Sequence, residues 1–176
     1  MRIRKGDKGK ITKNFDISEF FSDSPSVTEH YLDDKLIEAV QIIRDYVGVA
    51  WRITSTYRTK KANEAAGGKD NSYHLRGMAV DSQPWYQSDF NTYMPIIVDD
   101  INKRGPLFQS LRRAGINGFG LYDNFIHIDT REANSKHEDG YGRFAIWDNR
   151  ILKIRPDMEL KATLETFFFT RRARRI

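Results

Sequence analysis

The stretch SYHLRGMAVD, residues 72–81, decides how the chain folds around its most unusual side chain. Its second half begins a short, mainly apolar run from Met78 to Ser82, which predicts a central β-strand. Asp81 lies inside this run, although an ionised carboxylate is costly to bury unless it is paired or bound to a metal. The stretch therefore predicts a buried Asp81 that is either hydrogen-bonded in the core or part of a metal site.

A second stretch, FGLYDNFIHID at residues 119–129, places a histidine in an equally apolar setting. His127 has apolar neighbours on both sides, and His74 precedes Asp81 in the first stretch. Two imidazoles and one carboxylate are sufficient protein ligands for a catalytic zinc, which keeps a fourth position open for water. The alternative is that each is an ordinary hydrogen-bonded core residue, and spacing alone leaves both possibilities open.

Helical and strand patterns are mixed along the rest of the chain without a regular strand–helix–strand rhythm. An apolar stripe over 33–47, followed by Gly48, is typical of an amphipathic helix with a glycine C-cap. Pro95 is expected to break, or to begin, part of the helix over 89–103. Because no glycine-rich phosphate loop follows any strand, we expect an α+β fold with a small, mostly antiparallel sheet flanked by helices. The spacing of Asp16 and Glu19 predicts a capping box at 16–19, before a short helix that ends near Phe21. The other expected helices are 59–66, 107–114 and 158–169, and the expected strands are 50–56, 78–82, 125–130 and 143–147.

Length and composition limit the kind of protein this can be. A chain of 176 residues suits one domain with a real core. It has no cysteine, which excludes disulfides, cysteine zinc ligands and cysteine nucleophiles. No apolar run approaches the roughly 20 residues that span a bilayer, and the basic start MRIRKGDKGK lacks the apolar segment of a secretory signal. We therefore expect cytoplasmic synthesis and no membrane span.

The net charge of +5 is concentrated at the two ends of the sequence. Residues 1–10 and 171–176 carry +4 each, so residues 11–170 carry the remaining −3. Basic tails favour polyanions such as anionic cell-wall polymers or nucleic acid; the alternative is a tail that aids solubility or packing. The body is slightly acidic and contains no recognised nucleic-acid motif, so nucleic acid is not an expected partner.

Taken together, the two stretches resemble a known family. The pattern SxHxxGxAxD at 72–81, with FG and HID within 119–129, is similar to the zinc D-alanyl-D-alanine carboxypeptidase and murein endopeptidase family, which shares its fold with the hedgehog signalling domain. Upstream, STYR, an asparagine and Gly-Gly within 55–68 resemble the strand and loop before that family's first zinc ligand. The residues NF and SEF within 14–20 resemble its phage and prophage branch.

The resemblance covers about residues 14–147 and implies a division of the chain. We expect a basic N-terminal arm over 1–13, a zinc peptidase-like domain over 14–150 and a C-terminal extension over 151–176 with the arginine-rich tail.

Carried over to this sequence, the resemblance implies His74, Asp81 and His127 as zinc ligands. Arg58 matches the family's arginine that approaches the substrate carboxylate or carbonyl, a task that suits the guanidinium fork better than a lysine; the alternative is a surface salt bridge. Ser72 is expected either to hydrogen-bond the substrate or to fix the loop of His74.

The general base is where the sequence departs from the family. Many members carry an acid or a histidine two or three residues before the last ligand, but here these positions are Phe125 and Asn124. Asp123 is the favoured substitute, because it shares the face of His127 if the segment is extended. Asp129 also shares that face, with an equally good role in orienting a ligand imidazole.

The remaining histidines and aromatic residues have simpler expectations. His30 and His137 are expected at the surface. The aromatic residues near the motifs are expected mainly in the core, with a substrate groove as the alternative: Trp51, Tyr57, Tyr73, Trp85 and Tyr86.

These features predict a zinc-dependent peptidase that hydrolyses an amide in the stem or cross-link peptides of bacterial peptidoglycan. The resemblance and the absence of a signal segment favour a phage or prophage lysin that reaches the wall after release, or a virion component. The basic tails would hold it on anionic wall polymers. The alternative is a non-catalytic zinc-binding module of a phage particle, which the missing acid at Asn124 favours.

Overall fold

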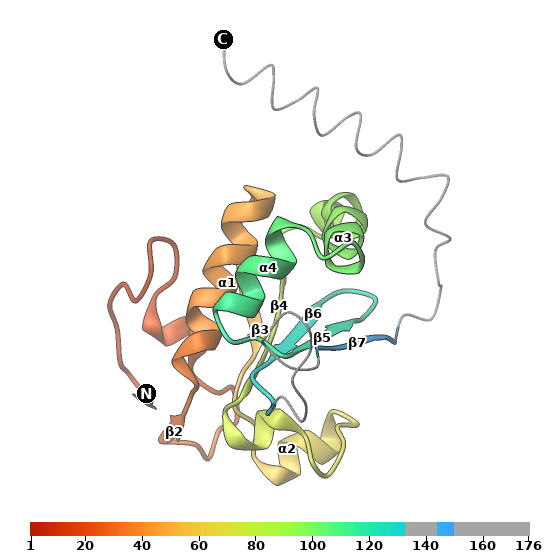
Figure 1. The fold of residues 1–176 in the computed structure, drawn as a ribbon. Helices are drawn as coiled ribbons and strands as arrows, with labels where there is room; N and C mark the ends of the chain where they lie inside the picture. The colour runs from red at the N-terminus through yellow and green to blue at the C-terminus, as the bar shows by residue number, and fades with distance from the viewer. Residues whose placement is uncertain (133–143, 150–176) are drawn as a thin grey trace.

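The main element of the fold is a five-stranded sheet (Figure 1). The computed structural model describes residues 1–132 and 144–149. The strand order is β3-β4-β6-β5-β7, and all neighbours are antiparallel except β5 and β7. This confirms the predicted α+β fold with a mostly antiparallel sheet. The strands are β3 (Trp51–Ser55), β4 (Ala79–Pro84), β5 (Gly118–Leu121), β6 (Ile126–Asp129) and β7 (Ala145–Asp148).

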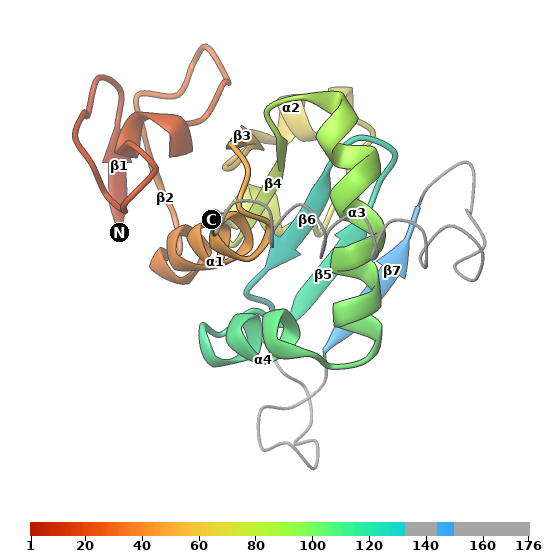
Figure 2. The same ribbon diagram turned by 90° about the horizontal axis from the view of Figure 1, so that it is seen from above.

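One face of the sheet is covered by three helices, α1 (Asp34–Val47), α3 (Gln87–Asn102) and α4 (Pro106–Arg113) (Figure 2). The predicted stripe of α1 is buried, and the helix ends at Gly48 in the left-handed region with φ 74°. Because side chains alternate along a strand, only every second strand residue faces these helices. The strand residues in the shared core include Val80, Phe119, Leu121, Ile126 and Ile128.

The expected break at Pro95 is wrong, because α3 runs through this residue without interruption. Proline removes one backbone donor from the helix. Its neighbours Met94, Ile96 and Ile97 are buried against the core, and this packing holds the helical path.

The first 31 residues pack onto the domain through a second, two-stranded sheet. β1 (Arg2–Arg4) pairs with β2 (Glu29–Tyr31), and Ile3 is completely buried. The capping box predicted at 16–19 is present and begins the short 3-10 helix η1 (Ile17–Phe20). The basic residues 1–13 therefore include a strand whose apolar residue belongs to the core.

His30 is buried rather than at the surface, so that prediction is wrong. Its Nε2 accepts a hydrogen bond from the Ser22 backbone N–H at 3.2 Å, and its Nδ1 lies 3.0 Å from the Tyr31 carbonyl. Its ring stacks on Tyr57 with centroids 5.3 Å apart. The short β1–β2 pairing brings His30 inside, and three-residue strands give too few alternations to predict from sequence.

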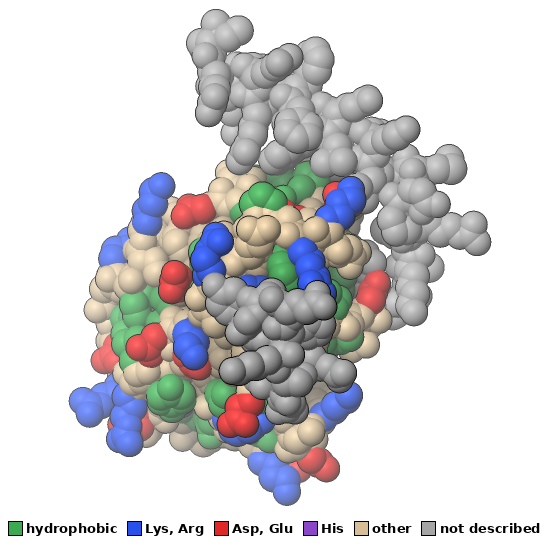
Figure 3. Space-filling model, viewed as in Figure 1, with side chains coloured by type: hydrophobic (Ala, Val, Ile, Leu, Met, Phe, Trp, Pro, Cys, Tyr) green, Lys and Arg blue, Asp and Glu red, His purple; other side chains and the backbone are tan. Residues whose placement is uncertain are grey.

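Acidic and basic side chains are intermixed on the face shown in Figure 3. Among the described residues, no helix is both long and apolar enough to cross a membrane. The predicted helix over 158–169, His137 and the arginine-rich tail lie outside the described residues.

Candidate metal centre

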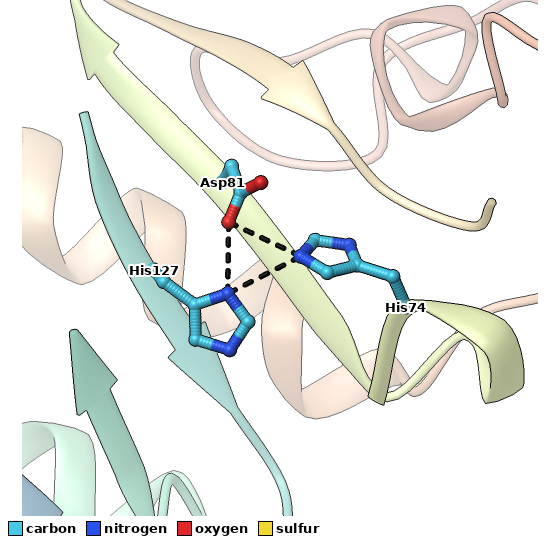
Figure 4. A group of neighbouring side chains, drawn as sticks. All are labelled: His74, Asp81 and His127. Carbon is cyan, nitrogen blue, oxygen red and sulfur yellow. Dashed lines mark hydrogen bonds and ion pairs between the residues drawn. The ribbon is translucent and has the colours of Figure 1, made fainter. Parts of the chain in front are cut away.

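Asp81 and His127 lie directly opposite each other on neighbouring strands, β4 and β6. His74 comes from the short 3-10 helix η2 (Tyr73–Arg76), which ends at Gly77 with φ 66°. A side chain at Gly77 would collide with the backbone carbonyl of Tyr31, so glycine is required where the chain turns into β4. The three predicted ligands thereby meet at the sheet face opposite the helices (Figure 4).

The ligand atoms form a compact triangle. Asp81 Oδ1 lies 2.8 Å from His127 Nδ1 and 3.2 Å from His74 Nε2, and the two nitrogens are 3.2 Å apart. Tetrahedral ligands about 2.0–2.1 Å from a zinc ion lie about 3.3 Å from one another. All three side chains are buried, and their two nitrogens and one oxygen suit a zinc ion with one further position open.

Each imidazole is held so that one nitrogen is available to a metal. The Nδ1 of His74 lies 2.5 Å from the carbonyl of Thr56, which can only accept a hydrogen bond. The Nε2 of His127 lies 3.1 Å from Asp129 Oδ2. When these outer nitrogens carry the protons, the inner ones, His74 Nε2 and His127 Nδ1, present lone pairs to the space beside Asp81.

The electrostatics of the cluster keep its carboxylate charged. Burial raises the pKa of Asp81, but hydrogen bonds with His127 and His74 outweigh this effect and hold the pKa well below its usual range. Burial lowers the pKa of His127, but its contacts with Asp129 and Asp81 raise it above the usual value overall. A cation entering the cluster therefore meets an ionised ligand and would displace any proton held between the rings.

Asp129 and Arg131 hold the outer side of His127, and only Asp129 was predicted from the sequence. Burial raises the pKa of Asp129, but hydrogen bonds with Arg131 and His127 bring it down to about 2. Arg131 binds both oxygens of Asp129, at 2.7 and 2.6 Å, and its guanidinium lies between the rings of Tyr73 and Trp147. Arg131 follows Asp129 by two residues, just beyond the end of β6, and this spacing is the signal that could have identified it.

Comparison of the sequence with known protein families identifies a match. A family profile described as Peptidase M15 matches residues 13–129, two thirds of the sequence. The chain belongs to the peptidase M15 family. M15 peptidases depend on zinc, in agreement with the His–Asp–His cluster. A search of curated proteins found no match to this M15 chain.

The two residues predicted to bind substrate in this M15 chain occupy different positions relative to the cluster. Arg58 contacts a ligand directly, because its Nη2 lies 2.5 Å from Asp81 Oδ2 and its Nε donates to Ser55 Oγ at 2.7 Å. Ser72 precedes η2, half-buried, and its hydroxyl does not cap that helix. Arg58 therefore orients the carboxylate of Asp81, and binding of substrate by Arg58 or Ser72 stays a prediction.

Asp123 lies in the exposed turn between β5 and β6, next to Asn124. The strand of His127 begins only at Ile126, so the extended segment that would put Asp123 on its face is not present. The argument from a shared face therefore fails, and a role of Asp123 as general base depends on the path of the turn. Asp129, in contrast, lies within the strand and is completely buried.

Proposed function

We propose that this M15 protein is a zinc-dependent peptidase that hydrolyses an amide bond in the stem or cross-link peptides of bacterial peptidoglycan. The observation that supports it most is the buried triangle of His74, Asp81 and His127, in which both imidazoles are held with their inner nitrogens toward the same space. A purely structural hydrogen-bonded core would not require two imidazoles and a carboxylate within about 3 Å of one another.

Zinc at this site would lower the pKa of a bound water toward neutrality and polarise the scissile carbonyl. The protein's own contribution is to fix the ligands and to receive the substrate. Arg58 holds one oxygen of Asp81, and its remaining N–H groups can donate to a substrate carbonyl or carboxylate beside the cluster. Stem peptides with free carboxylates suit such a cation.

Asp123 is the proposed general base, because it is an exposed carboxylate in the turn that leads into the strand of His127. We expect Asp123→Asn to lower turnover by roughly 10²–10⁴-fold, the effect of losing general-base catalysis. Zinc content should not change, and it can be followed by elemental analysis of the same preparation. Unchanged turnover in Asp123→Asn would remove Asp123 from the mechanism.

A second candidate function is a non-catalytic zinc-binding module, and the feature that favours it is Asn124 at the position where many relatives carry an acid. In that case the protein would hold zinc and bind the wall without cleaving it. Asn124→Asp separates the two functions: a gain of hydrolysis in this variant would show that the remaining site is competent.

The biological setting we propose is that of a phage or prophage lysin, or a component of a virion. Support comes from the NF and SEF residues within 14–20, where Phe15 and Phe20 pack edge to face in the core at 5.9 Å. The basic residues at both ends of the sequence would add attraction to anionic wall polymers.

The decisive experiment is digestion of purified peptidoglycan of two cross-link chemotypes by the zinc-supplemented protein, with products identified by mass. We expect new termini that disappear with a chelator and return on adding zinc. His127→Ala serves as the control with a dismantled site. Retention of one zinc per chain, with no product from either chemotype, would overturn the enzymatic function in favour of the non-catalytic module.

A further inference from the structure

The sheet face that carries the metal cluster continues past it along β3 and β4. Gln83 lies two residues beyond Asp81, and side chains two apart on a strand point to the same face. Arg52 of β3 is the register partner of Gln83, so both lie on the face of the cluster. Gln83 and Arg52 form a row across the two strands. Two residues of a strand span about 7 Å, so this row lies about 7 Å from the predicted ligands.

Arg52 is held in place by a buried amide. With the amide of Gln83 oriented to satisfy its neighbours, its oxygen accepts from Nε of Arg52 at 3.0 Å and also from Nη2. Its nitrogen then donates to the carbonyl of Asn124, in the turn before β6. Gln83 is only 7% exposed, so it fixes an otherwise mobile arginine and connects it to the turn beside the metal cluster.

Trp85 extends the same row. Its backbone N–H donates to the carbonyl of Ala50 at 2.8 Å, so the strand pairing continues past Pro84. Its ring lies under the guanidinium of Arg52, 5.8 Å from its carbon, although 55% of the residue remains exposed. The exposed part of the indole ring is therefore open to a ligand that approaches Arg52.

The guanidinium of Arg52 has an uncommitted charge. Among residues 1–132 and 144–149, no carboxylate forms an ion pair with it. Its Nε and Nη2 contact Gln83, which leaves the N–H groups of Nη1 for another acceptor. An exposed, pre-oriented cation beside an aromatic face matches a ligand with a carboxylate next to an aliphatic segment.

We propose that Arg52, Gln83 and Trp85 form a specificity subsite for the peptide substrate. Arg52 would bind a substrate carboxylate about two residues from the scissile amide, since extended residues advance about 3.4 Å each and the row lies about 7 Å from the cluster. Gln83 positions Arg52, and Trp85 packs on the aliphatic part of the same substrate residue. This subsite rests on the proposed peptidase function and determines which wall peptides are accepted.

The test uses two synthetic stem peptides that differ only in bearing a carboxylate or a carboxamide at the second residue from the scissile amide. Binding to the zinc-loaded full chain is measured by calorimetry and cleavage by mass spectrometry. The parent should bind the carboxylate peptide roughly 10–100-fold more tightly, the range of a charge-assisted hydrogen bond. Arg52→Gln should abolish this preference, and it should leave the affinity for the carboxamide peptide unchanged.

Two further variants separate binding from general damage. Arg52→Lys should retain part of the preference, because the charge stays while the fork is lost. Arg4→Gln, an exposed arginine on the separate two-stranded sheet, is the matched control and should leave the preference unchanged. The subsite would be overturned if the parent bound both peptides with equal affinity, or if Arg52→Gln lost the same amount of affinity for both. The proposed peptidase function would stand in either case. Failure of the parent to bind or cleave either peptide would overturn the peptidase function and the subsite with it.

Discussion

His127 shows how one side chain depends on contacts at both of its nitrogens. Its Nδ1 faces Asp81 within the cluster, whereas its Nε2 is held by Asp129, which Arg131 in turn binds through both oxygens. Carboxylates in this outer position fix the tautomer of a ligand imidazole and raise its basicity. In the proposed zinc site, the affinity for the metal would therefore depend on residues that do not touch it.

We expect Asp129→Asn to lower zinc affinity about 10–100-fold, because the neutral amide supports the imidazole less well and leaves Arg131 unpaired. Competition with a chromogenic chelator measures this change. Asp123→Asn is the matched control, since the same chemical change in the exposed turn should leave the affinity as it is. Equal affinities for Asp129→Asn and the parent would remove Asp129 from the support of the site.

His30 should make the fold sensitive to acid. Burial lowers its pKa below the usual 6.5, so the folded state prefers the neutral ring, whose Nε2 accepts from Ser22. The unfolded chain binds this proton from about pH 6.5 downward while the folded chain resists it, so stability falls as the pH drops below about 6.5.

The measurement compares the free energy of unfolding of the parent and of His30→Gln between pH 7.5 and 5.5. Their difference should shrink toward acid pH, with a slope of at most about 1.4 kcal/mol per pH unit, the limit for one proton. A constant difference over this interval would show that His30 does not titrate on unfolding.

At the scale of elements, strand β5 is the instructive case. Its sequence, GFGL, has glycine at both positions on the face of the metal site, and glycine is depleted in strands. A side chain at Gly118 would meet the carboxylate of Asp129, and one at Gly120 would meet the ring of Trp147. Neighbouring strands supply the side chains that cover β5, so its own sequence carries no strand signal and the strand was not predicted.

We expect Gly120→Ala to destabilise the protein by about 1–3 kcal/mol, the usual effect of overpacking a well-packed site. Trp147 must move to admit the methyl group, and its ring lies 5.4 Å from that of His127. Denaturant unfolding followed by tryptophan fluorescence measures the loss of stability and also reports the changed surroundings of Trp147. Gly120 is not among the glycines with a positive φ, so the expected cost comes from the contact with Trp147, and unchanged stability of Gly120→Ala would contradict it.

Elements with a strong local signal were predicted well, and those set by distant contacts were not. The helix over 34–47 carries its own apolar stripe and cap, and the central strand of Asp81 carries its own apolar run, so both were confirmed. The pairing of β1 with β2 joins residues 25–29 positions apart, and the path through Pro95 depends on packing. The same division holds in the site: the resemblance identified the three residues that converge in the cluster, whereas the place of Arg52 follows from strand pairing and that of Arg131 from its contacts with Asp129.

Metal binding should increase the stability of the whole folded molecule. The three ligands come from η2, β4 and β6, so a bound ion would join segments that lie far apart in sequence. Free zinc at 100–1,000 times its dissociation constant stabilises the folded state by about 2.7–4.1 kcal/mol.

Removal of zinc by a chelator should therefore lower the thermal midpoint by several degrees, and calorimetry of the same sample before and after dialysis measures it. Asp81→Asn is the control: with its metal affinity strongly weakened, the variant should show little difference between the two conditions. A midpoint that does not respond to zinc in the parent would contradict the site.

The buried Ile3 and the ring of Trp147 beside His127 show that the folded domain extends beyond the residues matched by the family profile. The family match spans 13–129, yet β1 lies before it and β7 after it, and both pack against residues inside it. A fragment cut at the limits of the match would lose the strand partner of His30 and one wall of the metal cluster together. The segment that the family profile matches is thus smaller than the segment whose strands and side chains surround the cluster in this chain.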